Sequence, residues 1–412
     1  MDRTLPFLRR MRLKNYKSIE SCDVTFTPLL VLLGPNAAGK SNFLDALRFV
    51  KEALDTTPAR ALETRGGLNE VLRRVPEGAD EFSVHLDLTV ESDGDPIFAE
   101  YGFTIARDAS GRRAFVVRRE WCVFRDAEDE SGFSKIRRQS RPLTSGFEVV
   151  AGLIVGAPDG RGGIERDRLF LPLAAIRDEF AELYAGLSDM LFYHVDVERM
   201  RQIEPRTQQA DLGPSGQNLG SLLGILARDH PVFKARVDDY IRAIVPGAAG
   251  VEERVLDNYS TIELRARNGD QELAFGPDSM SEGTLRAAGL LAALFQPAVL
   301  EGETTLLGIE EPETSLHPAA AGALFDALSE ASERVQTVVT TQSADLLDRD
   351  DFDPAFVRVV TMTDGLTTIG EIDDVSRRIV EDRRATVGEL MRGGQLLPKA
   401  QPDVKLPPEG MK

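Results

Sequence analysis

Residues 34–41 read Gly34-Pro35-Asn36-Ala37-Ala38-Gly39-Lys40-Ser41 and fit the pattern G-x-x-x-x-G-K-[ST], which is typical of a loop that holds phosphate. Glycines let the backbone N–H groups of such a loop curl around phosphate oxygens. The stretch follows the apolar run Leu29–Leu33, which predicts a strand buried on both faces. It precedes residues 41–54, whose apolar side chains recur at helical intervals, so a helix dipole points its positive end at the same anion. We therefore predict that Lys40 reaches the β- and γ-phosphates of a nucleotide and that the Ser41 hydroxyl ligates Mg²⁺.

A second motif, Thr305-Leu306-Leu307-Gly308-Ile309-Glu310-Glu311, is an apolar run that ends in two acids. The run predicts a buried strand, and the carboxyl ends of parallel strands open onto the ligand crevice of a sheet. One carboxylate there can hold the shell of a Mg²⁺ ion, and the next can polarise an attacking water. Pro312 and Glu313 follow, so an acidic helix N-terminus is the alternative interpretation. The phosphate loop upstream favours the first interpretation.

A third motif, Ser281-Glu282-Gly283-Thr284-Leu285-Arg286, opens an apolar stretch that predicts a helix ending at Phe295. A serine and a glycine at a helix N-terminus can bind a second anion. The same residues also fit an ordinary helix start with Ser281 as the N-cap. The motif by itself leaves both interpretations open.

The rest of the chain predicts a mixed α/β fold. Residues 82–125 alternate apolar and polar side chains, as antiparallel strands do, whereas helices and strands alternate over 281–341, which indicates a mainly parallel sheet with covering helices. No sustained heptad repeat occurs, so we expect no long coiled coil. Further expected elements are loops around one short strand at 126–168, a helix at 171–188, a strand at 191–195, helices within 216–244, three strands within 251–275 and a hairpin turning at Asp364-Gly365.

Composition restricts the class of protein. The 412 residues carry a formal net charge of −18, and 42% of them are hydrophobic, which excludes a wholly disordered or fibrous protein. The chain has no run of about 18 apolar residues and no apolar signal core at its start, so we expect a cytoplasmic protein. We expect Cys22 and Cys122 to be buried thiols, and the four histidines show no spacing typical of a zinc site.

The acidic charge argues against unaided binding to nucleic acid, because neutralisation of phosphates dominates that affinity. Local fields matter more than net charge, however, so a basic groove formed across a dimer is compatible with the sequence. The sequence contains two short runs of basic residues, and the alternative to a phosphate-binding role is that they form solvent-exposed surfaces. The two runs comprise Arg9, Arg10, Arg12, Lys14 and Lys17, and Lys135, Arg137, Arg138 and Arg141.

Together these segments resemble the ABC-type ATPases of the RecF/SMC and OLD (overcoming lysogenization defect) group, and they occur in that group's order. The phosphate loop GPNAAGKS comes first, the signature SEGTLR second, the Walker B segment LLGIEEPETSLHP third and the switch segment VVTTQSADLL last. The opening RLKNYKSIE resembles the group's first strand and adenine-side loop. Residues 126–270 show no such likeness. The chain looks like a stand-alone AAA-family ATPase of this group without a Toprim domain.

The resemblance implies the fold and the domains. The expected fold is an α/β P-loop ABC-type ATPase head with an antiparallel β subdomain, a helical insertion and no long coiled coil. The expected divisions are an N-terminal ATPase lobe at 1–125, an insertion at 126–270, a C-terminal ATPase lobe at 271–396 and a disordered tail at 397–412.

The resemblance also implies the roles of the site residues, with ATP and Mg²⁺ as cofactors. Lys40, Gln342 and Glu311 are the expected catalytic residues, Glu311 being the general base that positions water. Ser41 and Glu310 are the expected Mg²⁺ ligands. Nucleotide contacts are expected from Gly34, Pro35, Asn36, Ala37, Ala38, Gly39, Lys40, Ser41 and Asn42, and from Ser281 and Gly283 toward the γ-phosphate bound by a second subunit.

Two positions depart from the group's pattern. Glu310 stands where the Walker B acid is usually Asp, and it keeps the charge that attracts Mg²⁺. Gln342 stands where the switch residue is usually His, and an amide can donate a hydrogen bond to the γ-phosphate but cannot titrate near neutral pH. This change questions fast hydrolysis more than binding. Gln202 is a Q-loop candidate only by position, and Thr314–His317 is the loop expected to link the two sites of a dimer.

The expected activity is that of an ATPase, in a homodimer or higher homo-oligomer that ATP closes and hydrolysis reopens. Only about 60 residues follow the switch segment, too few for a nuclease domain of the Toprim kind, so we expect a separate effector, a nuclease in particular, in bacterial anti-phage defence. Two other hypotheses stay open: a RecF-like DNA-binding ATPase in repair, and a nucleotide-dependent assembly scaffold with little turnover. No membrane partner is expected.

Overall fold

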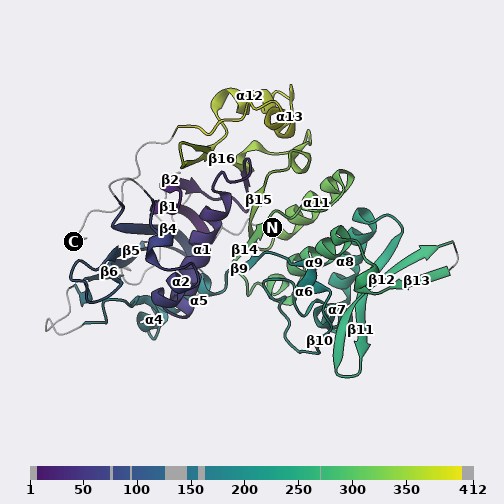
Figure 1. Cartoon of the computed structure of the whole chain (residues 1–412), viewed down its shortest axis with the longest axis horizontal. Coiled ribbons are helices and arrows are strands. Elements are labelled where there is room, and N and C mark those ends of the chain that lie inside the picture. Colours follow the sequence, from purple (N-terminus) through teal and green to yellow (C-terminus); the bar gives the residue numbers. More distant parts are fainter. Residues whose placement is uncertain are drawn as a thin grey trace.

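A large sheet of 13 strands forms the centre of the protein, and a second sheet of four strands projects from one side (Figure 1). The computed structural model describes residues 7–74, 78–92, 95–125, 146–155, 163–269 and 271–400. The large sheet comprises β1 (Leu8–Tyr16), β2 (Ile19–Thr25), β3 (Leu29–Leu33), β4 (Glu81–Ser92), β5 (Asp95–Arg107), β6 (Phe115–Arg125), β7 (Gly146–Val150), β8 (Leu153–Ile154), β9 (Leu191–Tyr193), β14 (Leu306–Glu310), β15 (Gln336–Thr341), β16 (Val357–Thr363) and β17 (Leu366–Glu371).

The large sheet joins an antiparallel half to a mainly parallel half. Its order is β8-β7-β6-β5-β4-β1-β2-β17-β16-β3-β15-β14-β9. Strands from β8 to β2 pair antiparallel, whereas β16, β3, β15, β14 and β9 pair in parallel. Along β3, Leu30 and Leu32 face one hydrophobic core, and Leu29, Val31 and Leu33 face the other. The expected strand buried on both faces is therefore confirmed.

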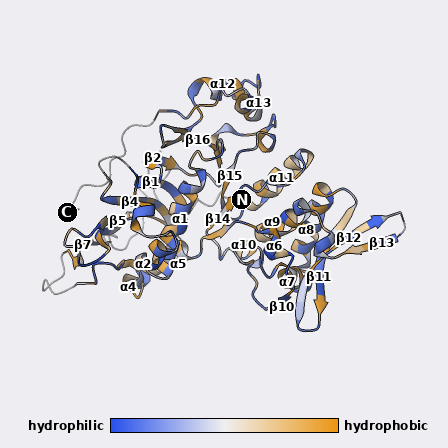
Figure 2. Cartoon of the chain, in the orientation of Figure 1, coloured by the Kyte–Doolittle hydropathy of each residue, from blue (hydrophilic) through white to orange (hydrophobic). Residues whose placement is uncertain are grey.

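Helices cover both faces of the sheet, because each face carries its own apolar core; Figure 2 shows apolar residues along the strands and the helices packed on them. The first core contains residues of α1 (Lys40–Asp55), α2 (Pro58–Glu63), α3 (Leu68–Val71), α4 (Leu171–Ala174) and α5 (Asp178–Ser188). The second contains residues of α6 (Val197–Met200), α7 (Leu219–Asp229), α8 (Pro231–Ile244), α9 (Glu282–Leu294), α10 (Pro297–Leu300), α11 (Ala321–Ser332), α12 (Asp374–Glu381) and α13 (Val387–Arg392).

The smaller sheet forms an arm that extends beyond the helices of the second core (Figure 1). It consists of β10 (Glu204–Pro205), β11 (Ala248–Leu256), β12 (Tyr259–Asn268) and β13 (Gln271–Phe275), all antiparallel. One face packs Val251 and Ile262 into the second core. The chain then passes from β13 through a short turn to the N-terminus of α9.

Two expected elements differ from the structure. The single helix expected at 171–188 is two helices, α4 and α5, separated at Arg177, which adopts an extended conformation. Asp178 and Glu179 follow this break, and acidic residues suit the first turn of a new helix. Where one short strand was expected within 126–168, the chain forms the β7–β8 hairpin, while residues 126–145 and 156–162 lie outside the described residues.

The C-terminal part is more ordered than expected. The tail was expected to be disordered from Leu397, but Lys399 N donates to Glu371 O at 2.7 Å and Pro398 pairs with Ile372. This short pairing covers the end of β17, which explains its order; residues 401–412 lie outside the described part. The two-residue turn at Asp364-Gly365 is confirmed, with both residues at positive φ, as such hairpins require.

Other broad features agree with the sequence. The longest helix among the described residues is α1, with 16 residues, so this part of the chain has no long coiled coil. None of the described helices combines the length and the apolar character needed to cross a bilayer. Both cysteines are buried free thiols, and burial raises the pKa of Cys22 to about 12. The division into domains at 125, 270 and 396 stays a prediction.

Candidate nucleotide site

The phosphate loop connects β3 to α1 and is shaped by two tightly packed glycines. A Cβ atom at Gly34 would lie 2.1 Å from the Val360 carbonyl oxygen. A Cβ atom at Gly39 would lie 2.1 Å from Thr367 Oγ1, and Gly39 has a φ of 102°, in the left-handed region. Neither position has room for a side chain. The loop backbone therefore approaches β16 and β17 at a distance that only glycine allows.

Lys40 lies in this loop with its ammonium group held by the loop itself. Its Nζ donates to the carbonyl oxygens of Gly34 at 2.8 Å and Pro35 at 2.9 Å, and the residue is only 4% exposed. Burial lowers the pKa of Lys40, and the negative charges of Glu311 and Glu313 oppose that shift. The cation therefore lies within electrostatic reach of the acids after β14.

The acid pair lies at the carboxyl end of β14, as expected. Glu310 Oε1 accepts from Arg48 Nη2 of α1 at 2.9 Å. Glu311 has a φ of 41°, and its N–H donates to the Thr340 carbonyl oxygen of β15 at 2.9 Å. This bond turns the chain out of the strand, so Glu310 faces α1 while Glu311 belongs to the loop that follows.

Gln342 joins the switch segment to the acidic loop by two hydrogen bonds. Its Nε2 donates to Glu311 Oε2 at 3.3 Å, and its backbone N–H donates to Glu313 Oε1 at 3.3 Å. The Thr314 hydroxyl lies 3.5 Å from Glu311 Oε2. Gln342 of the switch segment and Thr314 of the acidic loop therefore both contact the Glu311 carboxylate, at the end of the central strands.

Glu313 is a site residue that sequence reasoning did not single out. Its Oε1 accepts from Thr341 Oγ1 at 2.5 Å, and its buried Oε2 has no hydrogen-bond partner among the described residues. Burial raises the pKa of Glu313, partly offset by hydrogen bonds from Thr341 and Gln342. Its only sequence signal was a third acid just after the Glu310-Glu311 pair.

The signature residues lie at the start of α9, a helix of the second core. Ser281 Oγ accepts from Thr284 N at 3.1 Å, so the N-cap interpretation is confirmed. A Cβ atom at Gly283 would lie 2.4 Å from the Ser315 carbonyl oxygen, and Ser315 Oγ lies 3.4 Å from Glu282 Oε2. The signature thus contacts the Thr314–His317 loop of the same chain.

The Q-loop candidate has a different environment. Gln202 follows α6, and its N–H donates to Arg199 O at 3.2 Å. It lines a small cavity beside Glu204, Asn218 and Thr261, next to the arm. The structure therefore places Gln202 beside the arm, whereas the acid pair and the phosphate loop follow strands of the large sheet.

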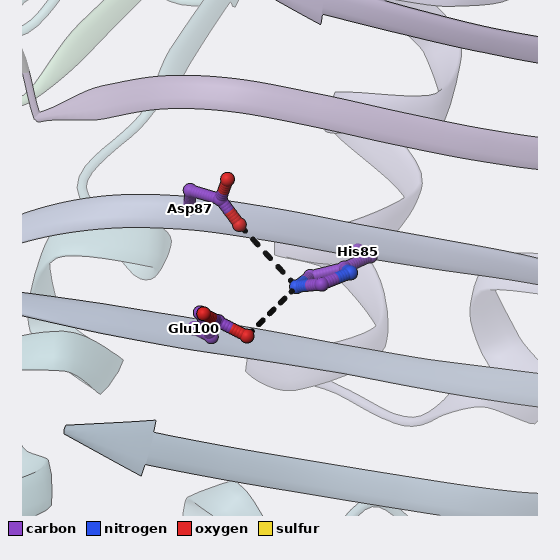
Figure 3. Close-up of side chains that lie close together, drawn as sticks. All are labelled: His85, Asp87 and Glu100. Atoms are coloured by element: carbon purple, nitrogen blue, oxygen red, sulfur yellow. Dashed lines mark ion pairs between the residues drawn. The ribbon is translucent and has the colours of Figure 1, made fainter. Parts of the chain in front are cut away.

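A further polar cluster lies in the antiparallel half, where His85 and Asp87 of β4 approach Glu100 of β5 (Figure 3). The fully buried His85 places Nε2 3.3 Å from Asp87 Oδ1 and 3.5 Å from Glu100 Oε2, a spacing that resembles a metal site. Arg12, however, lies 2.9 Å from His85 Nδ1 and also binds Asp87. A guanidinium can only donate, so Nδ1 accepts from Arg12 while Nε2 faces the two carboxylates. Arg12 thus already supplies the compensating cation, and the cluster ties three strands together.

Comparison with known proteins gives a decisive match. Residues 29–348 match the model of an AAA domain family, whose description also names the AbiEii toxin and type IV TA systems. The chain belongs to this AAA domain family. The matched residues include the phosphate loop, the signature, the acid pair and the switch segment.

Two kinds of relative agree with this AAA domain assignment. An OLD nuclease of Thermus scotoductus is 24% identical over 355 residues, covering 80% of this chain and 57% of the nuclease, so the chain spans little more than half of that protein's length. An SMC head bound to the C-terminal winged-helix domain of ScpA is 14% identical with a TM-score of 0.54, over 90% of this chain and 99% of that chain. An SMC head with an extended coiled coil, derived from Pyrococcus furiosus, is 14% identical with a TM-score of 0.52, over 92% and 100%. The expected likeness to the RecF/SMC and OLD group is confirmed, and the fold is that of an SMC head.

Proposed function

We propose that this AAA domain protein binds ATP with Mg²⁺ at residues 34–42 and hydrolyses it to ADP and phosphate. The observation that supports this most is that Lys40, Glu311 and Gln342 all follow the carboxyl ends of the adjacent parallel strands β3, β14 and β15, with Gln342 hydrogen-bonded to Glu311. Open α/β sheets bind ligands at that edge. The buried ammonium of Lys40 can exchange its two carbonyl partners for phosphate oxygens within the same loop.

The residues present suit a magnesium ion. Ser41, in the first turn of α1, offers a hydroxyl oxygen and Glu310, the last residue of β14, offers a carboxylate oxygen, and both are hard ligands of the kind that Mg²⁺ prefers. They would hold the ion, which neutralises charge on the phosphates when bound. Glu311 orients the attacking water and accepts its proton, and Gln342, which donates to Glu311, also offers an amide N–H to the γ-phosphate.

We further propose that a second copy of the chain completes the site. Gly283 and Glu282 contact Ser315 of the Thr314–His317 loop, and Ser281 caps its own helix α9, so we propose that this helix N-terminus meets the nucleotide of a second copy. The OLD relationship supports a role in cytoplasmic control of a separate effector such as a nuclease in anti-phage defence. Gln342 supports a second candidate, an assembly scaffold with little turnover, because it cannot titrate.

The test of the primary proposal is phosphate release measured on the full chain with ATP and Mg²⁺. We expect turnover by the wild type, loss of ATP binding in Lys40→Ala, and retained binding with at least a hundredfold slower turnover in Glu311→Gln. Glu333→Gln, an exposed acid after α11, is the control and should behave like the wild type. ATP binding without any phosphate release by the wild type would favour the scaffold, and no ATP binding would refute both candidates.

A further inference from the structure

Two hydroxyl groups from distant parts of the chain meet at the phosphate loop. Thr367 of β17 is 3% exposed, and its Oγ1 donates to the Ala38 carbonyl oxygen at 2.9 Å. Ser18, in the turn between β1 and β2, lies with Oγ 2.7 Å from the same Thr367 oxygen. Asn42 Nδ2, in the first turn of α1, lies 2.7 Å from Ser18 Oγ. The four residues form one continuous chain of hydrogen bonds.

Which group donates and which accepts in each of these hydrogen bonds follows from counting the available protons. The Ala38 carbonyl oxygen can only accept, so the single hydroxyl proton of Thr367 goes to Ala38. Thr367 Oγ1 must then accept from the Ser18 hydroxyl, which leaves Ser18 Oγ able only to accept from the amide N–H of Asn42. Each hydroxyl proton is used once, and no alternative arrangement satisfies all three contacts.

The chain of hydrogen bonds fixes the part of the loop that faces an anion. In a trans peptide the C=O and the following N–H point in opposite directions, and no described peptide bond is cis. Because the Ala38 carbonyl points at Thr367, the N–H of Gly39 points away from it. Asn42, which follows Ser41, bonds to Ser18 at the other end of this segment. The residues before and after Gly39–Ser41 are therefore both held by side chains from outside the loop.

Packing and backbone bonding make the contact rigid. Gly39 approaches Thr367 so closely that a Cβ would lie 2.1 Å from the hydroxyl oxygen. The Thr367 N–H also donates to the Ser18 carbonyl oxygen at 3.0 Å, which fixes the two hydroxyl-bearing residues relative to each other. The hydroxyls are thus placed by β17 and the β1–β2 turn, and not by the loop that they hold.

We propose that Thr367 and Ser18 are positioning residues that hold the phosphate loop in its nucleotide-binding shape. This inference rests on the proposed ATP binding and names the residues that set its affinity. A loop already held in shape binds phosphate without the free-energy cost of ordering its backbone. Loss of the Thr367 hydroxyl leaves the carbonyl of buried Ala38 without this donor, and the half-buried Ser18 hydroxyl loses the acceptor of its proton.

The test compares three variants on the same strand. Thr367→Val keeps the shape of the side chain and removes the hydroxyl, Thr367→Ser restores the hydroxyl, and Thr368→Val changes the exposed neighbour that lies on the opposite face of β17. We measure the dissociation constant for ATP with Mg²⁺, the KM and kcat of phosphate release, and the melting temperature. Thr367→Val should weaken ATP binding about tenfold and raise KM similarly while kcat at saturating ATP changes less than about threefold. Thr367→Ser and Thr368→Val should stay within about twofold of the wild type.

A second variant keeps the proposal testable if Thr367→Val fails to fold. Ser18→Ala interrupts the same chain of hydrogen bonds and should by itself weaken ATP binding and raise KM. Where Thr367→Val folds, the double variant should bind ATP no more weakly than Thr367→Val alone, because both remove one connected unit. Wild-type affinity in both single variants would overturn the inference while leaving ATP binding intact. An equal fall of kcat, affinity and melting temperature would also overturn it, since that result indicates a merely structural role. Absence of ATP binding in the wild type would instead refute the proposed function.

Discussion

Arg48 of α1 and Glu310 of β14, a proposed Mg²⁺ ligand, form an ion pair with Nη2 2.9 Å from Oε1. The two side chains are 29% and 15% exposed, so water screens the pair only partly. The Arg48 guanidinium also lies 5.5 Å from the centre of the Phe192 ring. Arg48 therefore supplies a positive charge to the carboxylate of Glu310, which we propose as a Mg²⁺ ligand.

Replacement of Arg48 should weaken the protein most when Mg²⁺ and ATP are absent. In Arg48→Met we expect the free energy of unfolding to fall by about 1–2 kcal/mol, because Glu310 loses its charged hydrogen bond. The loss should shrink with Mg²⁺ and ATP present, since the ion can replace the guanidinium. Urea unfolding with and without Mg²⁺ and ATP measures both values. Arg60→Met, which breaks a pair whose side chains are 66% and 67% exposed, should cost less than about 0.5 kcal/mol. An Arg48→Met loss that is equal in both conditions would contradict the proposed exchange.

Glu120 should make stability depend on pH. It is fully buried on β6, where Tyr101 OH and Leu171 N donate to its Oε1 at 3.0 Å each. Burial raises the pKa of Glu120 to about 7, from an ordinary value of 4.5. The folded state therefore holds a proton that the unfolded state releases, so stability is lost as the pH rises from about 4.5 to about 7.

The variant Glu120→Gln should remove this dependence. Relative to it, the wild type should lose up to about 3 kcal/mol of unfolding free energy over that pH range. Urea midpoints between pH 4.5 and 8 measure the difference, and Glu165→Gln, an exposed acid 70% accessible at its side chain, is the control. Parallel pH curves for the wild type and Glu120→Gln would show that Glu120 does not titrate in this range.

The sequence predicted those parts of the site that depend on local pattern. The apolar run Leu29–Leu33 predicted a buried strand. The spacing of the loop glycines and the two acids at the end of the second apolar run, at 310–311, predicted the rest. The hairpin at Asp364-Gly365 followed from its turn residues. Such features involve neighbours within a few residues, so their physical cause is visible in the chain itself.

The partners of these residues were not predictable, because they depend on the order of strands in the sheet. Thr367 reaches Ala38, 329 positions earlier, only because β17 lies beside β2. In the sequence, Arg48 is one of several polar residues on an amphipathic helix, and nothing near it in the chain indicates that it pairs with Glu310 of β14. The break at Arg177 was missed because the apolar spacing on its two sides resembles that of one longer helix. The helices after β17 were missed because they are short and mostly polar, so they resemble a polar tail.

A composite site should be restored by mixing two inactive variants. Lys40→Ala loses the phosphate loop cation, and Ser281→Arg blocks the helix N-terminus that the second copy would offer. In a heterodimer of the two, one site keeps both native residues. With random pairing, about half of the dimers are heterodimers, and each heterodimer has one intact site out of two. The mixture should therefore show about a quarter of wild-type turnover. A mixture of Lys40→Ala and Glu311→Gln, whose defects lie in the same half-site, should stay inactive. Equal activity in both mixtures, or in neither, would argue against shared sites.

Gln342 should control turnover more than binding, because its contacts are with Glu311 and Glu313 and not with the phosphate loop. In Gln342→Ala the Glu311 carboxylate loses the amide that orients it, so kcat should fall about tenfold. The dissociation constant for ATP should change less than about threefold. Ser343→Ala, which alters the next side chain, should leave both values near those of the wild type.

The histidine variant separates the role of the hydrogen bond from that of titration. The wild-type amide carries no titrating proton, so Gln342 should add no step to the pH profile of kcat near neutrality. Gln342→His places a group with an ordinary pKa of about 6.5 beside Glu311, so its profile should gain a step close to that value. Phosphate release at saturating ATP between pH 5.5 and 8.5, with Gln342→Ala as the flat reference, measures this step. A Gln342→His profile that matches the wild type would mean that residue 342 does not face the reacting groups during turnover.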